Sequence, residues 1–169
     1  MKAYTEKSTC NHKVIISLVF LAACMFLAAQ IAFGAGTSRS TAPAPTDPRE
    51  KANEYFDAGK RMQEVQRYKE ASKEYEKAVR IDDTFAEAHS NLGYTYRKQG
   101  LFEKAVKSYQ KAIQLNPKLA EAHEYLGEAY AEMGKFEEAE NELKILRDLG
   151  SDEADELEEF IRKMRSSKG

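Results

Sequence analysis

The residue types that most often carry chemistry are scarce in this chain of 169 residues. Two histidines, His89 and His123, stand 34 positions apart, and a pair of histidines could begin a metal site. A protein metal site needs a third or fourth ligand, and none is evident near either ring. We therefore expect both rings to serve packing, and no metal to be bound. Cys10 and Cys24 are the only cysteines, so the rest of the chain can supply neither a disulfide nor a thiol nucleophile.

Motifs for phosphate and acyl chemistry are also missing. The glycine pair in Gly93–Gly100 reads GYTYRKQG and lacks the Lys-Ser/Thr ending of a phosphate-binding loop, and no G-x-S-x-G elbow occurs. The net charge is −2, and it becomes −4 when residues 1–34, with three Lys and one Glu, are set aside. A nucleic-acid binder would show a basic excess. The sequence thus predicts a protein without catalytic site, cofactor or nucleic-acid partner.

Residues 1–34 have the pattern of an export signal. Three lysines precede Val14–Phe33, which contains no charged residue, and small residues follow. This order is typical of a secretory signal, with cleavage after Gly34. A helix over Val14–Phe33 would also span about 30 Å, the thickness of the hydrocarbon core, so an uncleaved anchor is an alternative. The lysines would then keep the N-terminus in the cytoplasm and export the rest.

A third alternative for the leader rests on Cys24. Leu21-Ala22-Ala23-Cys24 resembles the lipobox of bacterial lipoproteins, in which the cysteine is lipidated. Another apolar run follows Cys24, which favours an ordinary apolar role for it. All three alternatives place the remaining chain outside the cytoplasm, periplasmic or tethered, with membrane contact through the N-terminal segment alone. Residues 35–49 are rich in Pro, Ser, Thr and Ala and are predicted to form a flexible linker.

The elements that follow the linker belong to a repeat. Residues 52–153 divide into three blocks of 34 residues, 52–85, 86–119 and 120–153, in which the same residue types recur in columns: Gly59, Gly93 and Gly127; Tyr68, Phe102 and Phe136; Ala71, Ala105 and Ala139. A 34-residue period is typical of a solenoid of helix–turn–helix units. The columns predict that the glycine of each first helix faces the alanine of the second. Gly100 and Gly134 are predicted to end helices with a positive φ.

The middle block carries a specific resemblance. Leu92-Gly93-x-x-Tyr96, Ala105, Tyr109, Ala112 and Pro117 resemble the tetratricopeptide-repeat signature. The third block keeps Leu126-Gly127-x-x-Tyr130 and Ala139, but has Leu146 where the family prefers a small residue, and the first block has Gln66 at the turn glycine. Residues 152–166 show apolar residues at helical spacing, an acidic start and a basic end, which predicts a helix covering the last repeat. The resemblance implies an all-α, right-handed superhelical solenoid over residues 50–166, with seven helices.

The resemblance also implies a binding surface. In this family the first helices of the repeats line a concave groove that binds protein segments, and the matching positions yield these candidates: Phe56, Lys60, Asn91, Tyr94, Arg97, Lys98, Glu121, Glu124, Tyr125 and Glu128. Some members clamp the C-terminal carboxylate of chaperones, but only Asn91 of the matching positions fits, so no such clamp is expected. Four glutamates of the third block predict an acidic wall that favours a basic partner segment.

The sequence therefore predicts a non-catalytic scaffold of the bacterial cell envelope, which binds a protein or peptide in the groove and assists assembly of a complex. Two alternatives remain open at this point. One is a self-assembling structural protein, and the other is a lipoprotein assembly factor anchored through Cys24.

Overall fold

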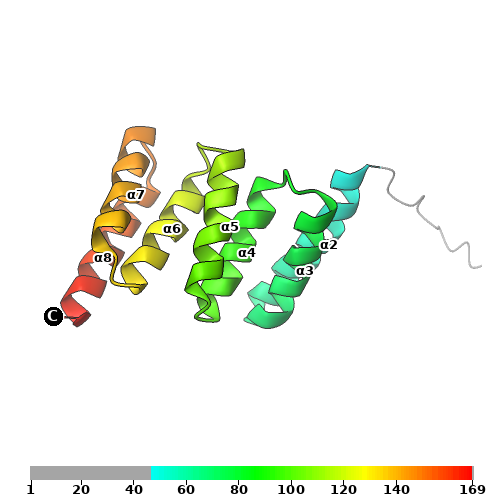
Figure 1. The fold of residues 1–169 in the computed structure, drawn as a ribbon, viewed down its shortest axis with the longest axis horizontal. Helices are drawn as coiled ribbons and strands as arrows, with labels where there is room; N and C mark the ends of the chain where they lie inside the picture. The colour runs from blue at the N-terminus through cyan, green and yellow to red at the C-terminus, as the bar shows by residue number, and fades with distance from the viewer. Residues whose placement is uncertain (1–46, 169) are drawn as a thin grey trace, which may run out of the picture. The chain divides into compact units, whose positions relative to one another are not determined.

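The computed structural model describes residues 47–168, which form seven α-helices (Figure 1). The helices are α2 (Pro48–Glu64), α3 (Tyr68–Ile81), α4 (Ala86–Lys98), α5 (Phe102–Leu115), α6 (Ala120–Glu132), α7 (Phe136–Leu149) and α8 (Glu153–Lys168). No strand occurs within this part of the chain, and the prediction of an all-α fold is confirmed. The predicted leader, with Cys24, and nearly all of the linker lie outside the described residues. Among residues 47–168, no helix is long and apolar enough to cross a membrane.

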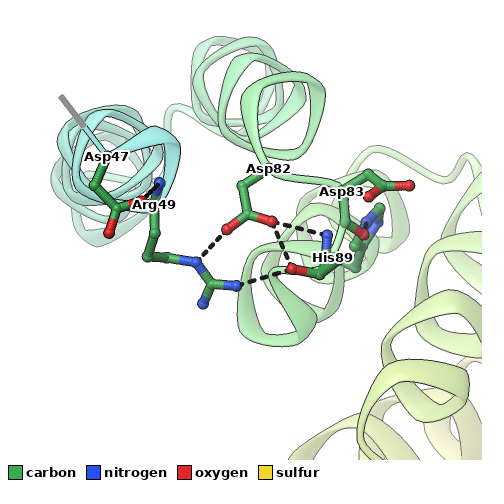
Figure 2. A network of polar contacts seen from close by, with 6 residues as sticks. Asp47, Arg49, Asp82, Asp83 and His89 are labelled. Atoms are coloured by element: carbon green, nitrogen blue, oxygen red, sulfur yellow. Dashed lines mark hydrogen bonds and ion pairs between the residues drawn. The ribbon is translucent and has the colours of Figure 1, made fainter. Parts of the chain in front are cut away.

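The first helix begins earlier than the sequence predicted. Asp47 caps α2 by accepting a hydrogen bond from the backbone N–H of Arg49 at 2.9 Å, and Pro48 fits the first turn because its missing N–H needs no partner there. The last two residues of the predicted linker are therefore helical. In Figure 2, Arg49 reaches from this turn to Asp82 and to the Thr84 hydroxyl in the loop before α4. This contact ties the start of α2 to the junction between the first two repeats.

The helices pack as consecutive pairs, α2 with α3, α4 with α5 and α6 with α7, and the pairs stack along the length of the unit (Figure 1). The predicted turn glycines have the expected geometry, since φ is +74° at Gly100 and +78° at Gly134. Gln66 takes the same place in the first repeat and is the one non-glycine residue of the described part with a positive φ, at +57°. The helix-ending turn is thus kept in the first repeat without its glycine.

The glycine columns serve a closer contact than the sequence predicted. We expected Gly93 to face Ala105, but the atoms nearest to a Cβ on Gly93 belong to the ring of Tyr109, with Cε1 at 2.6 Å. Gly59 meets the ring of Tyr75 in the same way, also at 2.6 Å. Both tyrosines are completely buried. The glycine therefore makes room for an aromatic ring of the second helix, because a ring projects much farther toward the first helix than a methyl group does.

The third repeat is completed by α8. The atoms nearest to a Cβ on Gly127 belong to Leu157 of α8, at 2.5 Å, and not to Leu143 of α7. Leu146, which departs from the family pattern, is completely buried in one apolar cluster with Leu157 and Ile161. The large residue at position 146 is accommodated because a single helix, and not a further repeat, packs there. In the third repeat, a leucine of α8 therefore takes the place beside the glycine that a tyrosine of the second helix takes in the first two repeats.

Candidate interaction surface

Two predicted tyrosines, one from the second repeat and one from the third, meet around a predicted arginine, Arg97. Tyr94 and Arg97 lie one turn apart on α4, and Tyr125 lies on α6, with the two tyrosine centroids 5.2 Å apart. The Arg97 guanidinium carbon lies 5.6 Å from the Tyr94 centroid and 5.9 Å from the Tyr125 centroid. Cations are attracted to the faces of aromatic rings at such distances. The rings and the guanidinium form one cluster between α4 and α6.

The charge of Arg97 is compensated inside the fold. The residue is only 5% exposed, and its guanidinium pairs with Glu128 and, at 2.9 Å, with Glu132 on the next repeat. A buried charge needs such partners, since an uncompensated one would cost several kcal/mol. The sequence placed Arg97 on the groove as a basic residue; the structure places it as a bridge between repeats. The basic residue left exposed there is Lys98, whose ammonium lies 5.2 Å from the Tyr94 centroid.

Within residues 47–168, Glu124, unlike Arg97, is buried without a group of opposite charge beside it. It is 9% exposed, yet no hydrogen bond or ion pair to it is found among the described residues. Burial, together with the charges of Glu128, Glu156, Glu153 and Glu121, raises the pKa of Glu124 to about 7. Burial likewise raises the pKa values of Glu121 and Glu128. The predicted acidic wall is thus a set of crowded, partly desolvated carboxylates.

Two members of this acidic set were missed by the sequence reasoning. Glu153 and Glu156 lie in the first turn of α8, which packs against α6. A hydrogen bond from Ser151 lowers the pKa of Glu153, which keeps its charge close to Glu124. The sequence feature that could have identified these two glutamates is the acidic start of the last helix. In the prediction from sequence, the helix dipole alone explains this acidic start, although Ala154 of α8 follows Ala120 of α6 by one repeat of 34 residues.

Phe56 and Lys60 of the first repeat and Asn91 of the second make other contacts, although the charge of Lys60 also acts on Glu121. The Phe56 ring packs at 4.8 Å from Phe85 and 5.6 Å from Tyr75, within the core contacts of the first repeat. Lys60 is exposed, with its ammonium 5.8 Å from the Phe56 centroid. Asn91 donates to the Glu87 carbonyl oxygen at 3.0 Å and accepts from the Tyr75 hydroxyl at 3.4 Å. Both ends of the Asn91 amide are therefore engaged within the fold.

The two histidines occupy equivalent places with different partners. In each, Nε2 lies 3.1 Å from a backbone carbonyl oxygen six residues earlier, that of Asp83 for His89 and that of Pro117 for His123 (Figure 2 shows the first). His123 is 3% exposed, and its Nδ1 lies 2.7 Å from the carboxylate of Glu142. The hydrogen bond with Glu142 raises the pKa of His123, whereas burial lowers that of His89. Within residues 47–168, no group of three or more His, Cys, Asp or Glu is placed to hold a metal ion.

Two hollows of the described part lie away from the predicted residues. One, of about 450 Å³, lies between α7 and α8 beside Leu143, Ile161 and Arg165. The other, of about 330 Å³, lies between α4 and α5 beside His89, Tyr96 and three lysines of α5. None of the predicted binding residues lines either hollow. Any partner of the predicted residues would meet an aromatic and acidic surface, not a deep pocket.

Comparison with known proteins matches this architecture. A sequence model of the TPR repeat matches residues 64–100 and 93–134. The TPR2B domain of yeast Sti1 superposes with a TM-score of 0.66 at 21% identity, covering 70% of this chain and 98% of that one. The Arabidopsis OM64 TPR domain has a TM-score of 0.64 at 18% identity, covering 69% and 98%.

A bacterial protein also shares the fold. The Yersinia enterocolitica type III secretion translocator chaperone SycD superposes with a TM-score of 0.63 at 15% identity, covering 70% of this chain and 95% of that one. No curated protein matches the chain at a significant level. At these identities the solved structures establish the fold alone. The match to the repeat model, the helix pairs and the shared fold agree: residues 64–134 consist of tetratricopeptide repeats, and residues 47–168 have the fold of a tetratricopeptide-repeat domain.

Proposed function

We propose that this protein is a non-catalytic scaffold that binds a segment of a partner protein on its first-helix face, outside the cytoplasm of a bacterial cell. The observation that supports it most is the acidic and aromatic surface of α4 and α6. Two tyrosines present rigid amphipathic rings there, a residue type common among interface hot spots. Beside them lies the carboxylate of Glu124, which has no cationic partner among residues 47–168.

The charge of this surface favours a basic partner segment. Proteins with this fold bind peptides: the first TPR of Spaghetti (RPAP3), at 23% identity, is bound to an HSP90 peptide, SRMEEVD, that ends in an acidic EEVD. The corresponding face of this chain carries glutamates in its third repeat, so an acidic C-terminus would be repelled. Complementary charges steer binding and exclude the wrong partners. We therefore infer a segment rich in lysine or arginine and no chaperone-type carboxylate clamp.

The export signal predicted for residues 1–34 supports the location, and the linker over residues 35–46 would let the repeats reach a partner away from a membrane. In this proposal the membrane is met only through the N-terminal segment. A fusion of residues 1–46 to a reporter that is active only after export would test it. Reporter activity is expected, and activity confined to the cytoplasm would refute the location.

Affinity capture tests the binding function. The bait is the full chain with a C-terminal tag, expressed in its own cell, beside a variant with Glu124→Lys and Glu128→Lys. One protein retained by the wild type and lost by the variant is the expected result. Identical captures by both baits would refute the assignment to α6. Capture of the bait's own chain alone would favour self-assembly, the second candidate function.

A further inference from the structure

The glutamates of α6 differ in whether a cation is paired with them. Glu128 faces Arg97, whose guanidinium is shared with Glu132 and stands beside two tyrosine rings. Glu124 lies one turn earlier on α6, at the same helical face, and has no such cation. One turn of the helix thus holds an arginine between rings and carboxylates. In the preceding turn, Lys60 and Tyr125 act on Glu121, whereas no cation of the described residues acts on Glu124.

Leaving a carboxylate desolvated without a partner is costly, and several charges of the same sign increase the cost. Glu124 is buried beside four other carboxylates, contributed by both α6 and α8: Glu121, Glu128, Glu153 and Glu156. We call these five residues the acidic socket. The cations beside these residues act on other members of the set: Arg97 and Lys98 act on Glu128, and Lys60 acts on Glu121.

We propose that the acidic socket, centred on Glu124, binds one lysine or arginine side chain of a partner protein. The inference rests on the proposed function and names the group that the first-helix face recognises. An organic cation suits the site better than a metal ion, because the carboxylates do not converge as a metal-ligand set within the described residues. The Arg97 cluster shows that this surface accommodates a guanidinium when carboxylates and a ring are beside it.

Binding should release a proton. Glu124, with a pKa of about 7, is about half protonated in the free protein at neutral pH, and an incoming cation favours the ionised form. The charged groups that act on Glu124 are the carboxylates of α6 and α8. Arg97 and Lys98 of α4 act on Glu128, and Lys60 of α2 acts on Glu121. If only the ionised form binds, linkage predicts that affinity rises by about tenfold between pH 6 and pH 8.

The test uses the full chain with 13C-labelled glutamate carboxyl groups and two blocked tripeptides, acetyl-Gly-Lys-Gly-amide and its norleucine counterpart. The lysine peptide is expected to shift the Glu124 resonance and to bind about tenfold more tightly at pH 8 than at pH 6. The norleucine peptide has no ammonium group and should cause no shift at Glu124. Because histidines also titrate in this range, the variant Glu124→Gln provides the comparison.

Glu124→Gln removes a buried, unpaired charge without changing size, so the variant is expected to fold. It should weaken binding of the lysine peptide at pH 8 by about tenfold, the loss of roughly one charge-assisted contact, and remove most of the pH dependence. Glu137→Gln removes an exposed charge from α7 and should leave both properties unchanged.

An unshifted Glu124 resonance, equal binding of the norleucine peptide, or the same pH dependence in Glu124→Gln would each overturn the socket. That failure is distinct from failure of the proposed function. If the wild-type bait still captures a partner and the charge-reversed bait does not, the scaffold function stands even though the acidic socket has failed.

Discussion

Replacing Gly93 by alanine should destabilise the protein, although alanine is the better helix former. A Cβ on Gly93 would lie 2.6 Å from Cε1 and 2.7 Å from Cδ1 of Tyr109. Carbon atoms in contact normally lie about 3.5–4.0 Å apart, so the ring or α4 would have to move by about 1 Å. Tyr109 is completely buried in a core cluster with Ala105 and Leu126, which leaves it no open space.

The magnitude follows from two opposing effects. Overpacking a dense core costs about 1–3 kcal/mol, and three ring atoms at or within 3.0 Å place this contact at the upper end of that range. The gain in helix propensity offsets about 1 kcal/mol. We expect the free energy of unfolding to fall by about 2 kcal/mol, which corresponds to a fall in Tm of about 6–10 °C for a domain of this size.

Urea unfolding followed by circular dichroism measures the change, with a lower midpoint at an unchanged m-value as the expected result. A double-mutant cycle with Tyr109→Leu isolates the contact. Without the ring, Gly93→Ala should cost at least about 1 kcal/mol less, because the clashing atoms are gone. If Gly93→Ala is as stable as the wild type, or costs the same in both backgrounds, the assigned close approach is wrong.

Three further predictions test other parts of the fold. Glu142→Gln should cost about 1–3 kcal/mol of unfolding free energy at pH 5.5 and less at pH 8.5. Because the pKa of His123 is raised in the folded state, the stabilisation by the His123–Glu142 pair is present at low pH and is lost as the pH rises through that pKa. Equal costs of Glu142→Gln at both pH values in urea titrations would contradict this assignment. Gln66→Gly should raise stability by about 0.5–1 kcal/mol by relieving a positive φ, and a lower thermal midpoint would speak against that strain. Leu157→Ala should cost about 2–4 kcal/mol because the side chain is completely buried, whereas Val65→Ala, at an exposed position, should change unfolding by less than about 0.5 kcal/mol.

Much of the fold followed from residue spacing alone. The second and third blocks begin where α4 and α6 begin, at Ala86 and Ala120, and the aromatic column marks the starts of α3, α5 and α7. Gly100 and Gly134 were predicted to have a positive φ, and they do. These features are local: a helix end, a turn or a helical face is set by residues within a few positions of one another. The helical period and the 34-residue repeat therefore suffice to place them.

The tertiary structure decided which side chains meet between elements. The spacing placed Arg97 and Glu128 on first helices, but only the packing of α4 on α6 pairs and buries them. Likewise Gly127 meets Leu157 of α8, although the repeat pattern pointed to the second helix of its own pair. The raised pKa of Glu124 depends on α8 as well, because Glu153 and Glu156 of that helix add their charges to those of α6. Burial and charge compensation are properties of the packed surfaces of different helices, and a periodic sequence specifies faces without specifying how far apart they lie.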